Sequence, residues 1–492
     1  MAITDQHIRN IFIYVMPKFF SYSINLIALP ILTRLLAPRE FGVIALAWMF
    51  PSVAVSVLSC GLSTAAQRYY FEYRDDAKKL FSFIFSVQVF LYLMFVVSSF
   101  VVFFLRGSIS KLVMGDSSFG LAVFVTFMAS FLGNIATFYF NLYQNMEKAT
   151  TYSIFMILQS SITVISGVLF VWYFKMSYMG ILYGFLLGSG AVCLMMMIYF
   201  NRNMKFIFGG RELWENIKYG LQVVPKAFTG FVTKFFDKYM LNSMLSLSVV
   251  GVYNIGQTIG NAMFFLIGKV WAAFQPVYYG EVFQKGDQAS SYVGRLFTKF
   301  AYIALTLVLL LILFAQELIY ILAPSSYYPA INVIIILAIG VSTQIFGMYS
   351  SVQYAYSKKA YWIFPITVIG TLVNVVTNII LIPKFGLLGA AIATAVFYFF
   401  INGLLAFIGQ KVYKIGYEWK IIISLYSIVI LSTGLILYAR FAQSGNIWLY
   451  FVKLGAISSF IYAGIKAKII TKHSVRKIRD SLIGFLPTKG AA

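Results

Sequence analysis

Lysine residues inside long apolar stretches are the side chains of this sequence with the clearest chemical meaning. Lys18 and Lys226 each follow a Val-x-Pro motif, and Lys234 and Lys238 continue the helical stripe that starts at Lys226. A charge inside a membrane is costly and usually faces a water-filled cavity on a transport pathway. Amines clustered in such a cavity bind anions, and phosphate or pyrophosphate is their natural match. These four lysines therefore predict a cationic cavity that binds an anionic substrate.

Two more cations and one carboxylate extend the predicted site. Arg68 and Lys269 fall in the same half of the membrane as the four lysines, although Arg68 also fits a snorkelling anchor at the cytoplasmic surface. Asp237 is the one clear carboxylate within an apolar stretch. It has two interpretations: it is an ion-coupling group, or it is the partner of Lys234 in a buried ion pair, since these residues are three positions apart.

Two prolines directly precede the first pair of lysines. Pro17 and Pro225 each remove a backbone donor from a predicted helix and are expected to kink it. Such a kink is either static or a place where a transporter bends between states. Lys453, in the last apolar stretch, lies outside this pattern and is predicted to snorkel or to contact lipid.

The composition excludes a water-soluble protein. Of the 492 residues, 61% are hydrophobic and 11% are charged, against about 45–50% and about 25% in ordinary soluble domains. The two cysteines lie in apolar runs, which excludes a secreted disulfide scaffold. Both histidines lie in the tails and nearly all of the 15 acidic residues lie in loops, so no metal-ligand cluster is recognisable. We predict a polytopic membrane protein that is not an enzyme and binds no metal or cofactor.

The apolar pattern predicts an all-α fold of about fourteen transmembrane helices, because a spanning helix needs about 20 apolar residues. The predicted segments are 11–33, 41–67, 80–105, 118–140, 150–173, 177–200, 217–243, 249–278, 296–320, 328–353, 360–382, 386–409, 419–438 and 446–466. Segment 217–243 is the doubtful one, because it carries Lys226, Lys234, Asp237 and Lys238 in its interior. The positive-inside rule supports it: with this crossing and both termini in the cytoplasm, most Lys and Arg residues fall in cytoplasmic segments.

Short motifs that recur at nearly one offset predict an internal repeat. The repeated motifs are Val15-Met16-Pro17-Lys18 and Val223-Val224-Pro225-Lys226, Phe41-Gly42-Val43 and Val250-Gly251-Val252, and Gly180-Ile181-Leu182 and Gly386-Leu387-Leu388, at offsets of 208, 209 and 206 residues. We predict two pseudo-symmetric six-helix lobes, residues 1–205 and 206–411. Residues 412–492 then hold a terminal helix pair and a basic cytoplasmic tail. Parallel repeats place the substrate site between the two halves, near the midplane.

Several motifs resemble one family of exporters. The stretch LPILTRLLAPREFGVIAL at 29–46 resembles the entry signature of the polysaccharide-export branch of the multidrug/oligosaccharidyl-lipid/polysaccharide (MOP) superfamily. Weaker matches are Gly61-Leu62-Ser63 with Gln67-Arg68-Tyr69, Tyr327-Tyr328-Pro329-Ala330, and KFGLLGAAIAT at 384–394. The matches spread over about residues 10–410, and the last two predicted spans carry little of this signature.

The resemblance implies a flippase of the O-antigen, or Wzx, type in a bacterial inner membrane. Such proteins turn undecaprenyl-pyrophosphate-linked oligosaccharides from the cytoplasmic to the periplasmic leaflet by alternating access. Their fold is a V-shaped pair of six-helix lobes around a cationic cavity. The resemblance assigns Lys18, Arg68, Lys226, Lys234 and Lys269 to that cavity and gives no coupling site. The implied partners are the lipid-linked substrate, the bilayer and other polysaccharide-assembly proteins, with no nucleic acid.

Other functions compete with this one. A flippase for another polyprenyl-linked envelope precursor, such as a peptidoglycan or teichoic-type unit, has the same sequence features. A multidrug antiporter that exports cations needs a cavity of the opposite charge. A membrane transferase or polymerase needs site acids or a large outer loop, and neither is seen in this sequence. A scaffold for a polysaccharide-assembly complex makes the cavity charges dispensable.

Overall fold

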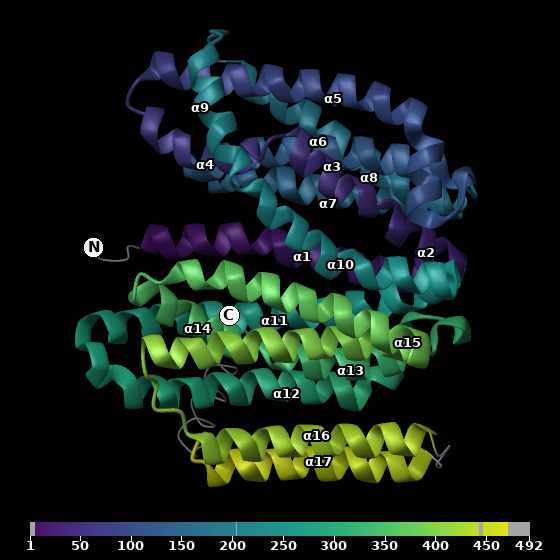
Figure 1. The fold of residues 1–492 in the computed structure, drawn as a ribbon, viewed down its shortest axis with the longest axis vertical. Coiled ribbons are helices and arrows are strands. Elements are labelled where there is room, and N and C mark those ends of the chain that lie inside the picture. The colour runs from purple at the N-terminus through teal and green to yellow at the C-terminus, as the bar shows by residue number, and fades with distance from the viewer. Residues whose placement is uncertain (1–4, 203, 442–445, 471–492) are drawn as a thin grey trace, which may run out of the picture. The chain divides into compact units, whose positions relative to one another are not determined.

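The computed structural model describes residues 5–202, 204–441 and 446–470, and the secondary structure of these residues is helical throughout (Figure 1). The predicted all-α class is confirmed. Ten stretches of these residues are long and apolar enough to cross a membrane. Helix α10 is not among them and carries four charged residues. The predicted basic tail from residue 471 onward, and its orientation, fall outside the described residues.

The helices follow one another along the chain. Their bounds are α1 (Asp5–Leu35), α2 (Pro38–Ala47), α3 (Met49–Leu58), α4 (Leu62–Tyr73), α5 (Ala77–Met114), η1 (Ser117–Phe119), α6 (Gly120–Asn145), α7 (Ala149–Trp172), α8 (Ser177–Asn201), α9 (Gly210–Leu221), α10 (Val224–Met244), α11 (Leu247–Lys285), η2 (Gly286–Ala289), α12 (Ser290–Leu322), η3 (Ser325–Tyr327), α13 (Ala330–Ser342), α14 (Gln344–Tyr356), η4 (Ala360–Trp362), α15 (Ile363–Val412), α16 (Trp419–Phe441) and α17 (Asn446–Lys466).

Each predicted segment falls on one helix or on consecutive helices, and the differences occur where the backbone breaks. Segment 41–67 covers α2, α3 and α4, and segment 328–353 covers α13 and α14. Segment 360–382 covers η4 and the first part of α15, and segment 386–409 lies in the second part of α15, after a break at Gly386. Gly386 has a φ of 55°, a value that glycine adopts without a steric penalty. The break therefore lies where the sequence predicted a boundary between two spans.

The segment around Pro225 corrects a prediction. It consists of two helices, α9 and α10, and not of one kinked helix. Pro225 lies in the first turn of α10, where the N–H that proline lacks would have no helical partner anyway. The single predicted span 217–243 is therefore two helices with a break directly before Pro225, and a kink at Pro225 stays a prediction. Pro17 lies inside α1, together with Pro30, and a kink at Pro17 stays a prediction.

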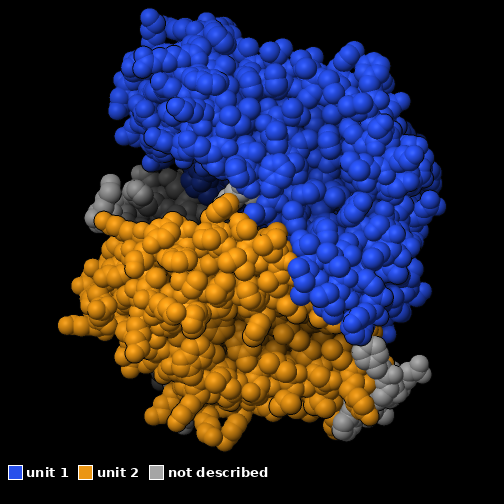
Figure 2. Space-filling view, viewed as in Figure 1, with its two compact units in different colours: residues 1–255, 319–330, 375–390 blue, residues 256–318, 331–374, 391–492 orange. Residues whose placement is uncertain are grey.

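The chain forms two compact units (Figure 2). Unit 1 contains residues 1–255, 319–330 and 375–390, and unit 2 contains residues 256–318, 331–374 and 391–492. In unit 1, α7 packs against α8 and α1, and α6 packs against α8, α5 and α4. In unit 2, the rings of Tyr278 and Tyr349 stack 4.3 Å apart inside an aromatic core. These units are defined by which residues pack together, and their boundaries differ from those of the sequence repeat. The predicted lobes 1–205 and 206–411 therefore stay a prediction.

The repeated Gly motifs meet inside unit 1. A Cβ added to Gly42 in α2 would lie 1.9 Å from the carbonyl oxygen of Leu247 in α11, and one added to Gly251 would lie 1.8 Å from that of Pro38. The offset of 209 residues that relates Gly42 to Gly251 also relates Pro38 to Leu247. A two-fold axis produces such reciprocal contacts. The sequence repeat thus has a structural counterpart where α2 and α11 begin.

Helices α16 and α17 lie side by side (Figure 1), and polar contacts join them to the rest of unit 2. Lys453 on α17 is 6% exposed, and its amine forms an ion pair with Glu317 of α12. The prediction that Lys453 snorkels or contacts lipid is wrong, because a carboxylate lies within reach of its amine. On α16, Arg440 donates to Asn332 Oδ1 at 3.0 Å and to Gln316 Oε1 at 2.6 Å. Charged side chains therefore fasten both helices to α12 and α13.

Replacing Lys453 by Met is expected to lower the Tm of the detergent-solubilised protein by several degrees. The substitution leaves the half-buried carboxylate of Glu317 without its charged partner, and a charge that is partly removed from water and unpaired destabilises the fold. A Lys453→Met/Glu317→Leu double variant should regain most of the loss. Lys466→Met, at an exposed position of the same helix, is the matched control. A Lys453→Met variant that melts like the parent would show that this ion pair does not stabilise the fold.

Candidate functional site

Helix α10 carries the largest group of predicted site residues. Three charged residues of the described chain are buried, and two of them, Asp237 at 1% and Lys238 at 4% exposure, are neighbours on this helix. The third is Lys453. Buried charges persist only when partners compensate for the lost hydration. The contacts of α10 therefore decide which of its charges are structural and which are available to a substrate.

Two consecutive residues of α11 satisfy the two buried charges of α10. The Tyr253 hydroxyl donates a hydrogen bond to Asp237 Oδ2 at 2.6 Å, and the backbone N–H of Lys238 donates to Asp237 Oδ1 at 2.7 Å. The Lys238 amine donates to Asn254 Oδ1 at 2.9 Å and lies 5.5 Å from the centre of the Phe235 ring. We call these residues, Asp237, Lys238, Tyr253 and Asn254, the α10–α11 network. It joins the start of α11 to α10 within unit 1.

Lys234 differs from Lys238 in its surroundings. Its side chain is exposed, and its amine lies 5.2 Å from the centre of the Phe235 ring. Among the ion pairs formed by the described residues, none joins Lys234 to Asp237. The ion-pair interpretation of these two residues is therefore not what the structure shows. Lys234 presents a charge at the surface of α10, whereas Lys238 lies inside the protein.

The other predicted cations lie on several helices. Lys18 is exposed on α1, and Arg68 is exposed on α4 with its guanidinium 4.7 Å from the centre of the Tyr219 ring on α9. Lys269 is half-buried in the part of α11 that belongs to unit 2, and its amine lies 4.9 Å from the centre of the Phe265 ring. Lys226 lies in the first turn of α10, but its side chain is outside the described set. Convergence of these cations on one cavity stays a prediction.

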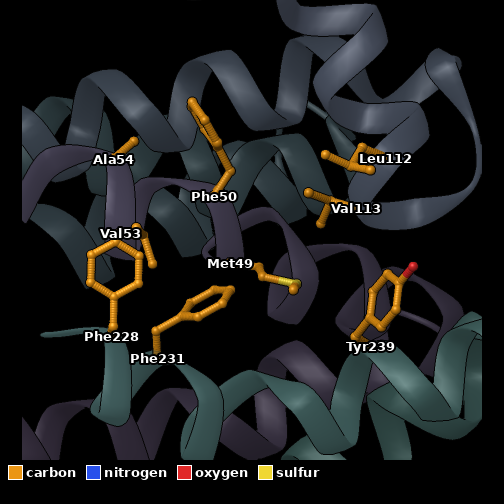
Figure 3. Close-up of a pocket in the computed structure, with 9 residues that line it drawn as sticks. All are labelled: Met49, Phe50, Val53, Ala54, Leu112, Val113, Phe228, Phe231 and Tyr239. Carbon is orange, nitrogen blue, oxygen red and sulfur yellow. The ribbon is translucent and has the colours of Figure 1, made fainter. Parts of the chain in front are cut away.

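An apolar pocket of about 400 Å³ lies against α10 in unit 1 (Figure 3). Its lining comes from three helices: Met49, Phe50, Val53 and Ala54 of α3, Leu112 and Val113 of α5, and Phe228, Phe231 and Tyr239 of α10. Sequence reasoning missed this pocket, because it searched for charged groups. The signal was present, since Phe228, Phe231 and Tyr239 lie on one face of a helix of 3.6-residue period.

One helix thus combines two properties within a single turn. Phe231 lines the apolar pocket, and the exposed Lys234 follows three residues later, about 4.5 Å further along the helix axis. An apolar wall next to a cation suits an amphiphile with an anionic headgroup. Within the residues that the structure describes, no group of three or more His, Cys, Asp and Glu side chains is placed to hold a metal ion.

Comparisons of the sequence agree with its motifs. Residues 7–277 match the family model described as "Polysaccharide biosynthesis protein". The uncharacterized membrane protein MJ1068 of Methanocaldococcus jannaschii is 29% identical over 201 residues, which are 40% of this chain and 39% of that protein. The chain therefore matches about two-fifths of the length of that relative.

Comparisons of the structure agree on one fold. A structure of the lipid II flippase MurJ, in an inward closed conformation, has a TM-score of 0.73 at 13% identity and covers 92% of this chain and 98% of its own. An inward-facing multidrug resistance MATE transporter of the MOP superfamily has a TM-score of 0.67 at 17% identity and covers 80% and 94%. A MOP transporter from Pyrococcus furiosus, reported to have a binding pocket of reverse polarity, has a TM-score of 0.54 at 14% identity and covers 82% and 95%. This chain therefore belongs to the polysaccharide biosynthesis protein family and has the fold of MOP-superfamily transporters.

Proposed function

We propose that this protein is a flippase for lipid-linked oligosaccharides. The observation that carries the proposal is the pairing on α10 of an apolar pocket wall, at Phe231, with the exposed side chain of Lys234. A lipid with an anionic headgroup needs both an apolar surface and a cation. The description of the family as polysaccharide biosynthesis proteins and the flippase activity named for MurJ support this class of cargo.

The cargo that we propose is undecaprenyl pyrophosphate carrying an O-antigen-type repeat unit. It moves from the cytoplasmic to the periplasmic leaflet of a bacterial inner membrane. Lys18 and Lys226 attract the pyrophosphate on the cytoplasmic side, and Lys234 and Lys269 hand it onward. Attraction between these charges is strong where little water is present. Alternating access follows when the cargo binds the two conformations with different affinities.

The α10–α11 network has a positioning role in this proposal. Asp237 accepts two hydrogen bonds, one of them from Tyr253, and the Lys238 amine donates to Asn254, so the network keeps α10 in place on α11. The exposed Lys234 is then held one turn before the network. This makes Lys234 a substrate-binding residue and Asp237 a positioning residue.

Reconstitution into liposomes tests the proposed function. Purified protein is inserted into vesicles that contain a fluorescent lipid-linked oligosaccharide, and leaflet exchange is followed by the loss of outer-leaflet signal, with and without ion gradients. We expect exchange of pyrophosphate-linked substrates well above that of protein-free vesicles. Substrates carrying an O-antigen unit and substrates carrying a peptidoglycan unit are compared directly. A higher rate for the peptidoglycan unit would replace the proposed cargo, and exchange at the protein-free rate for every substrate would overturn the flippase proposal.

Replacing Lys234 by Gln is expected to slow exchange by about 10- to 100-fold, because a hydrogen bond to a charged group is worth about 1.5–3 kcal/mol. Lys234→Arg keeps the charge and should retain most of the activity. Lys111→Gln, which removes an exposed lysine from α5, is the control for loss of net charge. Initial rates in the same vesicles give the comparison. Full activity of Lys234→Gln would remove Lys234 from the substrate path.

A further inference from the structure

Helix α9 has two faces of different character. It lies beside α4 and α5 in unit 1 (Figure 1), and it is not among the stretches apolar enough to cross a membrane. Its buried positions, Asn216 and Gly220, are four residues apart and mark the face that packs against unit 1. The opposite stripe is exposed and contains Arg211, Trp214, Lys218 and Leu221. These positions follow an i, i+3, i+7, i+10 spacing, so they share one side of the helix.

The inner face of α9 is fixed closely to α4. A Cβ added to Gly220 would lie 2.1 Å from the carbonyl oxygen of Cys60, so the two backbones touch where α9 ends. The Tyr73 hydroxyl donates to Glu215 Oε2 at 2.9 Å, and Tyr69 donates to the Glu215 carbonyl oxygen at 3.3 Å. Since α9 is held at several points along its length, the direction of its outer stripe is determined.

Glu215 belongs to this attachment and not to the outer stripe. The hydrogen bond from Tyr73, followed by that from Arg211 Nε at 3.1 Å, lowers the pKa of Glu215 below its usual value. The carboxylate therefore stays ionised at neutral pH and is already engaged. Glu215 pairs with Arg211 and not with Lys218. Among the ion pairs of the described residues, none contains Lys218, which is a cation of the outer stripe.

The outer stripe exposes large apolar side chains beside these cations. Trp214 is 64% exposed and Leu221 is 46% exposed. The segment that precedes α9 adds the exposed rings of Phe206 and Phe208 and the exposed amine of Lys205. Exposed apolar patches of this kind mark a binding surface. Aromatic rings mixed with lysines are typical of helices that lie in the interfacial region of a membrane.

We propose that the outer stripe of α9, together with residues 205–208, binds anionic phospholipid in the interfacial region of the membrane. Lys205 and Lys218 contact the lipid phosphates. Trp214 and the two phenylalanine rings insert between the headgroups. Charge complementarity favours this occupant, and α9 packs beside α5, one of the stretches long and apolar enough to cross a membrane. This surface is separate from the transport site and does not depend on which cargo is carried.

A fluorescent probe on the stripe tests the proposal in nanodiscs that contain phosphatidylglycerol and phosphatidylcholine. Gly210→Cys is suitable, because an added Cβ meets one heavy atom within 4 Å, in the Phe208 ring at 3.9 Å. The two native cysteines, Cys60 and Cys193, are replaced by Ala before labelling. Nitroxide is attached near the headgroup end of the acyl chain, either on phosphatidylglycerol or on phosphatidylcholine. Quenching of the probe then reports which lipid lies next to α9.

We expect the nitroxide on phosphatidylglycerol to quench the probe more strongly than the same nitroxide on phosphatidylcholine. Lys205→Gln/Lys218→Gln should reduce this preference by about fivefold for each cation removed. The matched control is Lys78→Gln/Lys79→Gln, two exposed lysines at the start of α5, which should leave the preference unchanged. Absence of quenching by either lipid, as for a stripe that faces water or a protein partner, would overturn the proposal. Equal quenching by both lipids in the parent protein would also overturn it.

Discussion

Asp237→Ala is expected to destabilise the protein by about 3–5 kcal/mol, the cost of leaving a buried charge, here that of Lys238, without the opposite charge that compensates it. Lys238 would remain buried at 4% exposure without the carboxylate beside it. The Tyr253 hydroxyl would also lose its acceptor, and an unsatisfied buried polar group costs about 1–3 kcal/mol. Thermal unfolding in detergent, followed by intrinsic fluorescence, measures the loss as a lower Tm.

A double variant separates charge burial from packing in this experiment. Asp237→Leu/Lys238→Met removes both charges and keeps apolar volume, so it should recover much of the stability lost by Asp237→Ala. Tyr253→Phe removes one hydrogen bond and should have a smaller effect. If Asp237→Ala unfolds at the temperature of the parent protein, or if the double variant is the least stable of the set, the α10–α11 network does not stabilise the fold as described.

Gly251→Ala is expected to disfavour the observed packing of α2 against α11 by about 1–3 kcal/mol, the usual cost of overpacking. The added Cβ would lie 1.8 Å from the Pro38 carbonyl oxygen. A backbone atom cannot rotate away as a flexible side chain can, so the two helices must separate. Gly42→Ala should act in the same way, because its Cβ would meet the Leu247 carbonyl oxygen at 1.9 Å. Under the alternating access proposed above, the change shifts the population toward conformations in which this contact is open.

Spin labels on the two helices measure that shift. Arg39 and Ser248 are exposed and are related by the same 209-residue offset. Each is replaced by Cys, for spin labelling, in a protein from which Cys60 and Cys193 have been removed. Double electron–electron resonance should show a longer distance between the two spin labels in Gly251→Ala and in Gly42→Ala than in the parent protein. Gly230→Ala is the matched control, because a Cβ there meets nothing within 4 Å. Unchanged distances in both Gly251→Ala and Gly42→Ala would show that the glycine contact does not hold the helices together.

The sequence predicted the helical membrane fold well, because the energetics of insertion depend on local runs of apolar residues. The lysines of α10 were also visible, since a charge within an apolar run stands out. The partners of those charges were not visible. Tyr253 and Asn254 each lie 16 residues beyond their partners Asp237 and Lys238, on the next helix, and Glu317 precedes Lys453 by more than a hundred residues. Only the packing of helices brings such residues together.

The start of α10 shows a second limit of sequence reasoning. Pro225 reads equally well as a kink inside one helix or as the first turn of a new helix. Which of the two occurs depends on the residues before Pro225. There Gly220, in the last turn of α9, lies against the backbone of Cys60. That close approach is a tertiary contact between α9 and the turn that precedes α4. The local sequence around Pro225 does not predict this contact. The apolar pocket beside Phe228 and Phe231 was missed for the related reason that its other walls come from α3 and α5.

The reciprocal contact between α2 and α11 bears on the ancestry of the chain. Two identical subunits that associate about an axis make such a contact twice, so a single inherited change alters both copies of it. After duplication and fusion into one polypeptide, the two copies become separately variable. Gly42 with Leu247 and Gly251 with Pro38 are then two adjacent contacts at which the residues on one helix constrain the divergence of those on the other. Relatives in which one glycine has been lost are expected to carry a compensating change on the facing helix.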